Sequence, residues 1–147
     1  MPARVTTREP EPGRGFSVRP IGRVRSSLRA RGEAPRQGSE GAPAAWLELD
    51  ADVCAGLEGI AVGDEIIVLT WFHESSRDVL RLHPRDDPSL PIAGVFATRS
   101  PDRPNPIGLH RVRVLDVAGS RMRVGPLEAI DGTPIVDIKP VLEVEDH

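Results

Sequence analysis

Residues 64–72 read Asp-Glu-Ile-Ile-Val-Leu-Thr-Trp-Phe, and they are the strongest candidate for a core β-strand in this chain. β-Branched and aromatic side chains follow one another here, and such side chains pack well on the pleated surface of a sheet. The run ends at the polar pair His73-Glu74. We therefore predict that this segment is the central strand and that the rest of the domain is built around it.

Shorter stretches on both sides of this strand have the composition of further strands. Apolar and polar residues alternate at 111–116, which predicts a strand with one buried face and one solvent-facing face. The 15 prolines and 14 glycines argue against helices, because inside a helix each proline costs about 3 kcal/mol and each glycine about 1 kcal/mol. The other predicted strands are 16–25, 47–49, 92–98, 121–124 and 134–142, with a helical turn at 52–57. The predicted fold is mainly β, an antiparallel barrel or sandwich with short helical turns and long loops.

The length and composition limit what the chain can be. With 147 residues, of which 39% are hydrophobic and 28% charged, it has the size and mix of one compact domain. Residues 1–15 are rich in Pro, Arg and Glu, so we expect a disordered N-terminal tail before a domain at 16–147. Cys54 is the only cysteine and the histidines lack metal-ligand spacing, so we expect neither a disulfide nor a metal. No apolar run is long enough to span a membrane, and we expect a cytoplasmic protein.

The charge is small overall but uneven along the chain. The formal net charge is −3, made up of +5 in residues 1–45, −7 in residues 46–98 and −1 in residues 99–147. Of the 19 basic residues, 18 are arginine, whose planar guanidinium suits carboxylate and phosphate groups. The global charge therefore does not indicate a nucleic-acid binder, although local basic patches are compatible with it.

Residues 98–108 read Thr-Arg-Ser-Pro-Asp-Arg-Pro-Asn-Pro-Ile-Gly and predict a rigid loop. Three prolines fix φ, remove three backbone donors and push the residues before them toward extended conformations. Arg99 and Arg103 are then held ready to bind an anion, with little entropy left to lose. The alternative is a stiff turn whose arginines pair with Asp102 or with other acids in the chain.

Two further segments are candidates for binding or proton transfer. The turn Asp131-Gly132-Thr133-Pro134 offers backbone groups and one carboxylate that could bind an adenine edge or a ribose, although it also has the sequence of an ordinary hairpin turn. The pair His73-Glu74 could supply a general base at a strand end. Neighbouring residues on a strand point to opposite faces, so only one of these two side chains is expected to face a pocket.

Several of these segments together resemble the TsaA-like family, typified by tRNA methyltransferase O. They are Gly-Val-Phe-Ala-Thr-Arg-Ser-Pro at 94–101, Arg-Pro-Asn-Pro-Ile-Gly-Leu at 103–109, Asp-Gly-Thr-Pro at 131–134 and Asp-Ile-Lys-Pro at 137–140. The likeness extends from about Ile21 to Pro140. It implies a single small antiparallel β-barrel, usually a homodimer, that binds S-adenosyl-L-methionine. It also implies N6-methylation of threonylcarbamoyladenosine next to the anticodon of tRNA.

The resemblance also implies site residues by matching position. Residues Arg103 and Asn105 are hallmarks of the family, and we predict that they bind the substrate, Arg103 through an anion such as a carboxylate or phosphate. Methyl transfer from a sulfonium depends mostly on alignment of the reactants, so a base need only remove one proton. His73, Glu74 and Asp131 all remain candidates for that base. The implied cofactor-binding residues are Gln37, Gly38, Ser39, His73, Glu74, Arg99, Leu109, Asp131, Gly132, Thr133 and Pro134.

The sequence also departs from the family pattern. His110 stands where many members have serine, and Val141 stands where an aromatic residue is common. Two alternatives to the tRNA reaction therefore stay open. The first is a methyltransferase that acts on another RNA or on a small metabolite. The second is a non-catalytic barrel that binds S-adenosyl-L-methionine or RNA.

Overall fold

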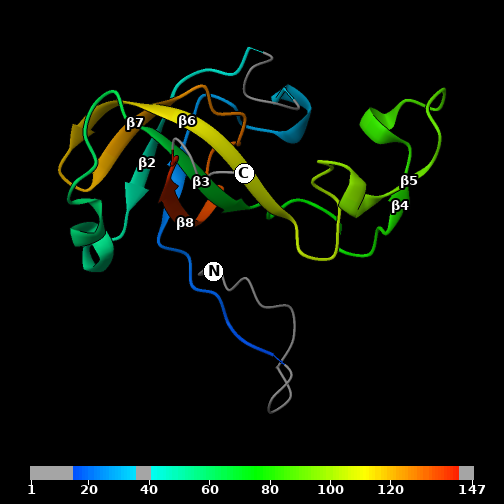
Figure 1. The fold of residues 1–147 in the computed structure, drawn as a ribbon, viewed down its shortest axis with the longest axis horizontal. Coiled ribbons are helices and arrows are strands. Elements are labelled where there is room, and N and C mark those ends of the chain that lie inside the picture. Colours follow the sequence, from blue (N-terminus) through cyan, green and yellow to red (C-terminus); the bar gives the residue numbers. More distant parts are fainter. Residues whose placement is uncertain (1–14, 36–40, 143–147) are drawn as a thin grey trace.

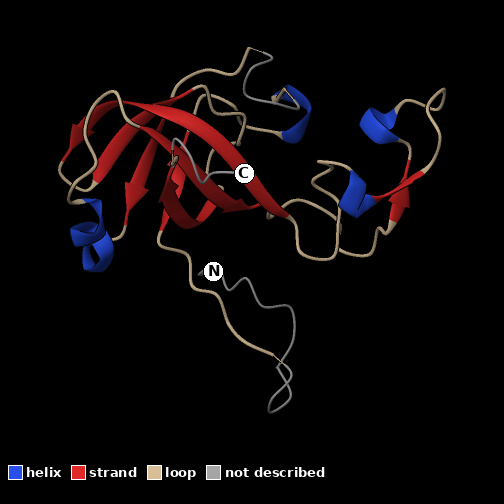
Figure 2. Cartoon of the chain, viewed as in Figure 1, coloured by secondary structure: helices blue, strands red, loops and turns tan. Residues whose placement is uncertain are grey.

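The structure is a computed structural model that describes residues 15–35 and 41–142. Its main feature is a sheet of six antiparallel strands that forms a closed barrel in the order β1-β2-β7-β6-β3-β8 (Figures 1 and 2). The sheet closes because β8 pairs with β3 along one edge and with β1 along the other. The strands are β1 (Gly22–Arg25), β2 (Ala45–Leu49), β3 (Glu65–Trp71), β6 (Ile107–Ala118), β7 (Arg121–Gly125) and β8 (Pro134–Pro140).

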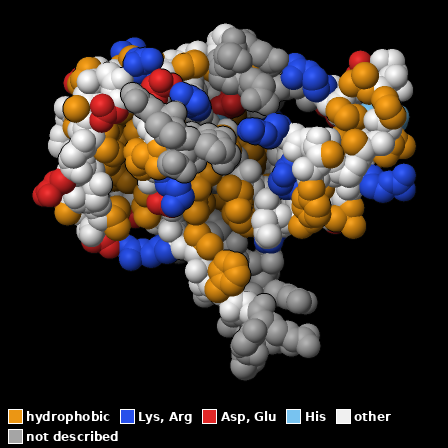
Figure 3. All heavy atoms as spheres, in the orientation of Figure 1, with side chains coloured by type: hydrophobic (Ala, Val, Ile, Leu, Met, Phe, Trp, Pro, Cys, Tyr) orange, Lys and Arg blue, Asp and Glu red, His pale blue; other side chains and the backbone are white. Residues whose placement is uncertain are grey.

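A lobe formed by residues 72–106 extends from one side of the barrel, on the right in Figure 1. It leaves the barrel at the end of β3 and returns at the start of β6, its paired neighbour. Hydrophobic side chains that stay exposed gather on this lobe, among them Leu80, Ile92 and Phe96 (Figure 3). The lobe contains the strand pair β4 (Arg81–Leu82) and β5 (Ala93–Gly94) and the 3-10 turns η4 (Pro84–Asp86) and η5 (Val95–Ala97); two more turns, η1 (Arg31–Glu33) and η3 (Ala51–Leu57), follow β1 and β2.

The core of the barrel is built around β3. This strand is paired on both sides, and its alternate residues Ile66, Val68 and Thr70 are buried inside the barrel. Full burial of an aliphatic side chain stabilises a fold by about 1.5–3 kcal/mol, so the alternation fixes which face of the strand turns inward. The apolar residues packed with them come from the five remaining barrel strands and from the segment after β7. They are Val24, Ala45, Leu47, Leu49, Val112, Val114, Met122, Val124, Leu127, Ala129 and Ile135.

The prediction of a mainly β fold with antiparallel strands and short helical turns is confirmed, and so is the central strand predicted at 64–72. The strand predicted at 92–98 is wrong. Only Ala93–Gly94 pair as a strand, and Val95–Ala97 form a 3-10 turn. Of the three residues in this turn only Val95 is buried, whereas Phe96 keeps 80% of its surface exposed. The apolar run is therefore part of the lobe and not of the barrel.

Several predicted boundaries also shift. The first strand starts at Gly22 and not at residue 16, so the segment before Pro20 lies outside the sheet. The last strand ends at Pro140, two residues before the predicted end. β6 begins at Ile107, inside the segment predicted as loop, because Pro106 is the last of the three prolines and the following residues can donate backbone hydrogen bonds.

The remaining expectations concern the N-terminal tail, membrane-spanning segments and metal binding. Residues 1–14 of the predicted tail lie outside the described residues. Within 15–35 and 41–142, no helix is long and apolar enough to cross a membrane. The same ranges contain no group of three or more His, Cys, Asp or Glu side chains arranged to hold a metal ion.

Gly108 leaves the space in which two buried polar side chains meet. It lies in β6 directly opposite Thr70 of β3. A Cβ at this position would lie 2.5 Å from Thr70 Oγ1, 2.5 Å from Phe72 Cζ and 2.7 Å from His110 Nε2. Thr70 Oγ1 and His110 Nε2 are themselves hydrogen-bonded at 2.7 Å. A side chain at position 108 must therefore separate these two groups.

We expect Gly108→Ala to lower the free energy of unfolding by about 1–3 kcal/mol, because an added methyl group in a packed interior displaces its neighbours. Gly56→Ala is the control, since a Cβ there meets nothing within 4 Å and the change should stay within about 0.5 kcal/mol. Urea denaturation of the three proteins measures both effects. Equal stability of Gly108→Ala and the wild type would show that this part of the barrel relaxes freely.

Candidate functional site

A cavity of about 610 Å³ lies between the end of β3, the lobe and the segment that precedes β8. Its volume is in the range of small-molecule sites, which is about 300–1,000 Å³. The cavity is lined by parts of five segments that are far apart in the sequence: 31–35, 72–75, 82–86, 97–102 and 128–133. The cavity thus lies where the lobe meets the segments that follow β1 and β7.

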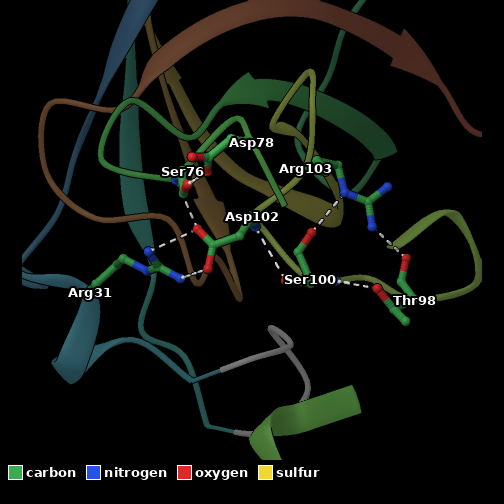
Figure 4. Close-up of polar contacts among 7 residues, drawn as sticks. All are labelled: Arg31, Ser76, Asp78, Thr98, Ser100, Asp102 and Arg103. Atoms are coloured by element: carbon green, nitrogen blue, oxygen red, sulfur yellow. Dashed lines mark hydrogen bonds and ion pairs between the residues drawn. The ribbon is translucent and has the colours of Figure 1, made fainter. Parts of the chain in front are cut away.

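The proline-rich loop beside this cavity is held by the side chain of Arg103 (Figure 4). Its guanidinium donates to the carbonyl oxygens of Ser100, Thr98 and Val95 at 2.7, 2.6 and 2.8 Å. A loop with three prolines cannot be held by a strand ladder, so an arginine with several donors in a fixed fork replaces that ladder. The side chain of Arg103 thus bonds its own loop and the preceding turn η5, while its backbone N–H donates to the carbonyl oxygen of Ser76 at 3.1 Å.

Asp102 connects the loop to two other segments (Figure 4). Arg31 of η1 donates to both of its carboxylate oxygens, at 3.1 and 3.0 Å, and the backbone N–H of Ser76 donates to Oδ1 at 2.9 Å. Burial alone would raise the pKa of Asp102, but the hydrogen bonds from Arg31 and Ser76 outweigh it and hold this pKa below its usual range. The alternative in which Arg99 or Arg103 pairs with Asp102 is not seen among the described residues. The arginine that pairs with Asp102 is Arg31 of η1.

A second arginine, Arg77, holds the other end of the loop. It donates to the carbonyl oxygen of Pro104 at 2.6 Å and to Oδ1 of Asn105 at 2.8 Å. Its guanidinium also lies 4.8 Å from the centre of the Trp71 ring, in the geometry of a cation–π contact. Desolvation by burial lowers the pKa of Arg77. Arg77 thus fastens the loop to the last residue of β3.

The structure brings together some of the residues predicted to bind the cofactor. His73, Glu74, Arg99 and Thr133 all line the cavity, although they come from three separate segments. Both His73 and Glu74 line it despite their adjacent positions, because the strand has ended at Trp71 and strict alternation no longer applies. Arg99 is exposed, and the structure records no hydrogen bond or ion pair for it among the described residues.

Other predicted residues lie elsewhere. The carboxylate of Asp131 accepts from the backbone N–H of Ser26 at 3.0 Å and from Arg29 at 3.3 Å, and it does not line the cavity. Leu109 is on the outer face of β6 and is 48% exposed. Gly132, with φ +85°, makes the predicted turn, and Pro134 begins β8; neither lines the cavity, nor do Arg103 and Asn105. Residues Gln37, Gly38 and Ser39 lie outside the described residues.

The sequence analysis did not single out Glu128 as a site residue. Glu128 lines the cavity, and its carboxylate is hydrogen-bonded to Nδ1 of the buried His110. Nε2 of the same ring is bonded to Thr70, and the ring stacks edge-on against Phe72 at 5.8 Å. The signal in the sequence was a lone glutamate inside the otherwise apolar run 126–130.

A β-barrel with a cavity of this size beside a braced, arginine-bearing loop is a ligand-binding β-domain. The chain belongs to the family described as tRNA-methyltransferase O N-terminal domain, which it matches over residues 23–147. The resemblance seen in the sequence is therefore confirmed.

Similar proteins agree with this family. The chain is 42% identical over 120 residues to the probable S-adenosyl-L-methionine-binding protein VirR of Rhizobium radiobacter, covering 82% of this chain and 67% of VirR. It is 40% identical over 126 residues to a probable S-adenosyl-L-methionine-binding protein of Methanothermobacter thermautotrophicus, covering 86% of this chain and 90% of that protein. The crystal structure of TrmO from Pseudomonas aeruginosa superposes with a TM-score of 0.70 at 33% identity, covering 90% of this chain. This chain spans 58% of the length of that TrmO chain.

The ion pair of Asp102 predicts a pH-dependent stability. Because the pKa of Asp102 is lowered in the folded protein, its carboxylate stabilises the fold fully above the unfolded-state pKa of about 3.9. That stabilisation is lost as the pH falls through the folded-state pKa. We expect Asp102→Asn to lower the free energy of unfolding by about 1–3 kcal/mol at pH 7, because a part-buried charged acceptor is lost. The difference from wild type should shrink below about pH 4.

Chemical denaturation from pH 3 to pH 7 measures this difference. Asp78→Asn is the matched control, since the one hydrogen bond described for Asp78 comes from the neighbouring Ser76 side chain, and its effect at pH 7 should stay within about 0.5 kcal/mol. A difference between Asp102→Asn and wild type that stays constant down to pH 3 would contradict the role given to this carboxylate.

Proposed function

We propose that this chain is an S-adenosyl-L-methionine-dependent methyltransferase that methylates N6 of threonylcarbamoyladenosine beside the anticodon of tRNA in the cytoplasm. The observation that carries this proposal is that His73, Glu74, Arg99 and Thr133, which match cofactor positions of the family, line one cavity. Membership of the tRNA-methyltransferase O family supports the reaction class. The names of the relatives, which describe S-adenosyl-L-methionine binding, support the cofactor.

The donor set of the cavity fits this cofactor. Arg99, with no described partner, is suited to bind the carboxylate of an amino acid moiety. Glu74 is suited to an ammonium or to hydroxyl groups, and Phe72 and Ile130 offer apolar contact for a purine ring. When bound, the cofactor supplies the methyl group. The chain's own contribution is to bind, orient and desolvate the reactants, which accounts for much of the barrier reduction in a transfer between two bound groups.

The braced loop explains how Arg99 could be held in position. Arg103 bonds the carbonyl oxygens on both sides of Arg99, those of Thr98 and Ser100, so the backbone at Arg99 is fixed before a ligand arrives. Such preorganisation reduces the entropy lost on binding. The substrate-binding role predicted for Arg103 and Asn105 stays a prediction; their described contacts give both a role in fixing the loop.

We also propose that the protein works as a homodimer. Leu109 matches a cofactor position of the family, yet it lies on the outer face of β6, away from the lining of the cavity. It could contribute to a cofactor site only if a second copy packs against this face. Exposed apolar residues support such packing, since contiguous apolar surface commonly marks a protein interface. They lie on the outer face of β6 and on the lobe: Ile107, Leu109, Leu115, Leu80, Ile92 and Phe96.

A second candidate is a protein that binds S-adenosyl-L-methionine without transferring its methyl group, or that methylates another RNA or a small metabolite. It is favoured by the relatives, whose names state binding and no reaction. Methyl transfer to tRNA that carries the threonylcarbamoyl modification distinguishes it from the leading proposal.

We expect isothermal titration calorimetry to detect binding of S-adenosyl-L-methionine to the folded protein. We further expect radiolabelled methyl transfer to tRNA from cells that make the threonylcarbamoyl modification, and none to tRNA from cells that lack it. Binding without labelling of either tRNA would favour the non-catalytic candidate. Equal labelling of both would reject the modified nucleoside as the acceptor.

We expect Arg99→Ala to weaken binding of S-adenosyl-L-methionine about 10- to 100-fold, because a charge-assisted hydrogen bond contributes about 1.5–3 kcal/mol. Stability should change by less than about 0.5 kcal/mol, because no described residue depends on the Arg99 side chain. Arg81→Ala is the control, since Arg81 is an exposed arginine of the same lobe that does not line the cavity. A large loss of stability with unchanged affinity would make Arg99 part of the loop scaffold.

A further inference from the structure

Glu128 lines the cavity with a side chain that is only 11% exposed, and a buried network holds one of its carboxylate oxygens. His110 is 3% exposed and Thr70 is 0% exposed, so neither ring nitrogen of His110 has ready access to water. Thr70 Oγ1 lies 2.7 Å from Nε2, and Glu128 Oε1 is hydrogen-bonded to Nδ1. The three residues come from β3, from β6 and from the segment between β7 and β8. A buried histidine therefore connects the barrel core to the cavity.

The hydrogen bonds define the direction of this network. An ionised carboxylate only accepts, so the hydrogen between His110 and Glu128 belongs to Nδ1. In a neutral imidazole Nε2 then accepts, and the Thr70 hydroxyl donates to it. The hydroxyl can also rotate and accept from an Nε2–H, so Thr70 can bond His110 in either direction. The other carboxylate oxygen, Oε2, receives no hydrogen bond recorded among the described residues.

The other candidates for a base are less suited by position. The side chains of His73 and Glu74 are 36% and 51% exposed, so water competes for their lone pairs. Both oxygens of Asp131 accept hydrogen bonds from the segment after β1, and this residue does not line the cavity. The Glu128 side chain is 11% exposed, lines the cavity and is fixed at one oxygen. A general base acts through a fixed geometry, with water excluded.

We propose that Glu128 is the base of the methyl transfer and that His110 is its positioning residue; this rests on the proposed methyltransferase function. Glu128 accepts the proton that leaves the acceptor nitrogen as its bond to the methyl carbon forms and the sulfonium S–C bond breaks. The sulfonium loses its positive charge as it becomes a thioether, and the carboxylate loses its negative charge as it takes up the proton. Charge and atoms therefore balance. His110 keeps Oε1 bonded and thereby turns Oε2 toward the acceptor.

The test uses the full chain, S-adenosyl-L-methionine and modified tRNA. Glu128→Gln keeps the size of the side chain and an oxygen that can accept from His110. We expect kcat to fall at least about 100-fold, the usual contribution of a general base. The KM for tRNA and the calorimetric Kd for S-adenosyl-L-methionine should stay within about threefold, since a base acts mainly on the chemical step. Glu58→Gln, which alters an exposed glutamate outside the cavity, should leave kcat unchanged.

Variants of His110 test its positioning role. In His110→Asn the amide nitrogen takes the place of Nδ1 as donor, so kcat should stay within about fivefold of wild type. His110→Leu removes the donor, and kcat should fall at least about tenfold with the Kd for S-adenosyl-L-methionine unchanged. Thermal unfolding checks that both variants fold. In the unliganded wild type, heteronuclear NMR should find a hydrogen on Nδ1 of His110.

The outcomes separate this inference from the proposed function. If the wild type transfers methyl groups and Glu128→Gln is equally active, the inference is overturned and the proposed function stands. If the wild type binds S-adenosyl-L-methionine but modifies no RNA, the proposed function fails first. A His110 ring with its only hydrogen on Nε2, or equal loss of kcat in His110→Asn and His110→Leu, would overturn the positioning role.

Discussion

The site depends on how a loop with three prolines is held in place. Proline has no backbone N–H, so residues 98–106 cannot be fixed by the ladder that fixes each strand of the barrel. Their carbonyl oxygens still require donors, and Arg103 and Arg77 supply them to Thr98, Ser100 and Pro104 with hydrogen bonds of 2.6–2.7 Å. Arginine suits this task because it offers five donors in a planar fork. These hydrogen bonds hold the loop in place while Arg99 lines the cavity.

The barrel could be predicted from the sequence because its signals are local. In β3 the alternation of Ile66 and Val68 with less buried neighbours is visible in the residues themselves. The lobe could not be predicted in the same way. Residues 92–98 have the apolar composition of a strand, but whether such a run is paired depends on which segments lie beside it. Here η5 interrupts it, and Phe96 remains exposed.

The sequence placed only part of the candidate site, because it does not show which polar side chains bond to the protein itself. Arg99 and Arg103 look alike in the sequence, yet Arg99 lines the cavity and Arg103 turns back onto its own loop. Asp131 has a carboxylate suited to a ligand, but it is bonded to Ser26, 105 residues away. Hydrogen-bond partners so far apart in the sequence are brought together by the closure of the barrel, and no local sequence pattern predicts them.

The link between barrel and cavity depends on a matched set of residue sizes. The imidazole of His110 reaches Thr70 because Gly108, between them on the inner face of β6, has no side chain. A serine at position 110, as the family resemblance suggests for many members, is shorter and lacks the two ring nitrogens through which His110 bonds Thr70 and Glu128 here. The orientation of the cavity carboxylate in this chain is thus set by a histidine, a threonine and a glycine inside the barrel. Glu128 is thereby anchored to the core at one carboxylate oxygen, which suits a group that must meet a reacting atom within hydrogen-bond distance.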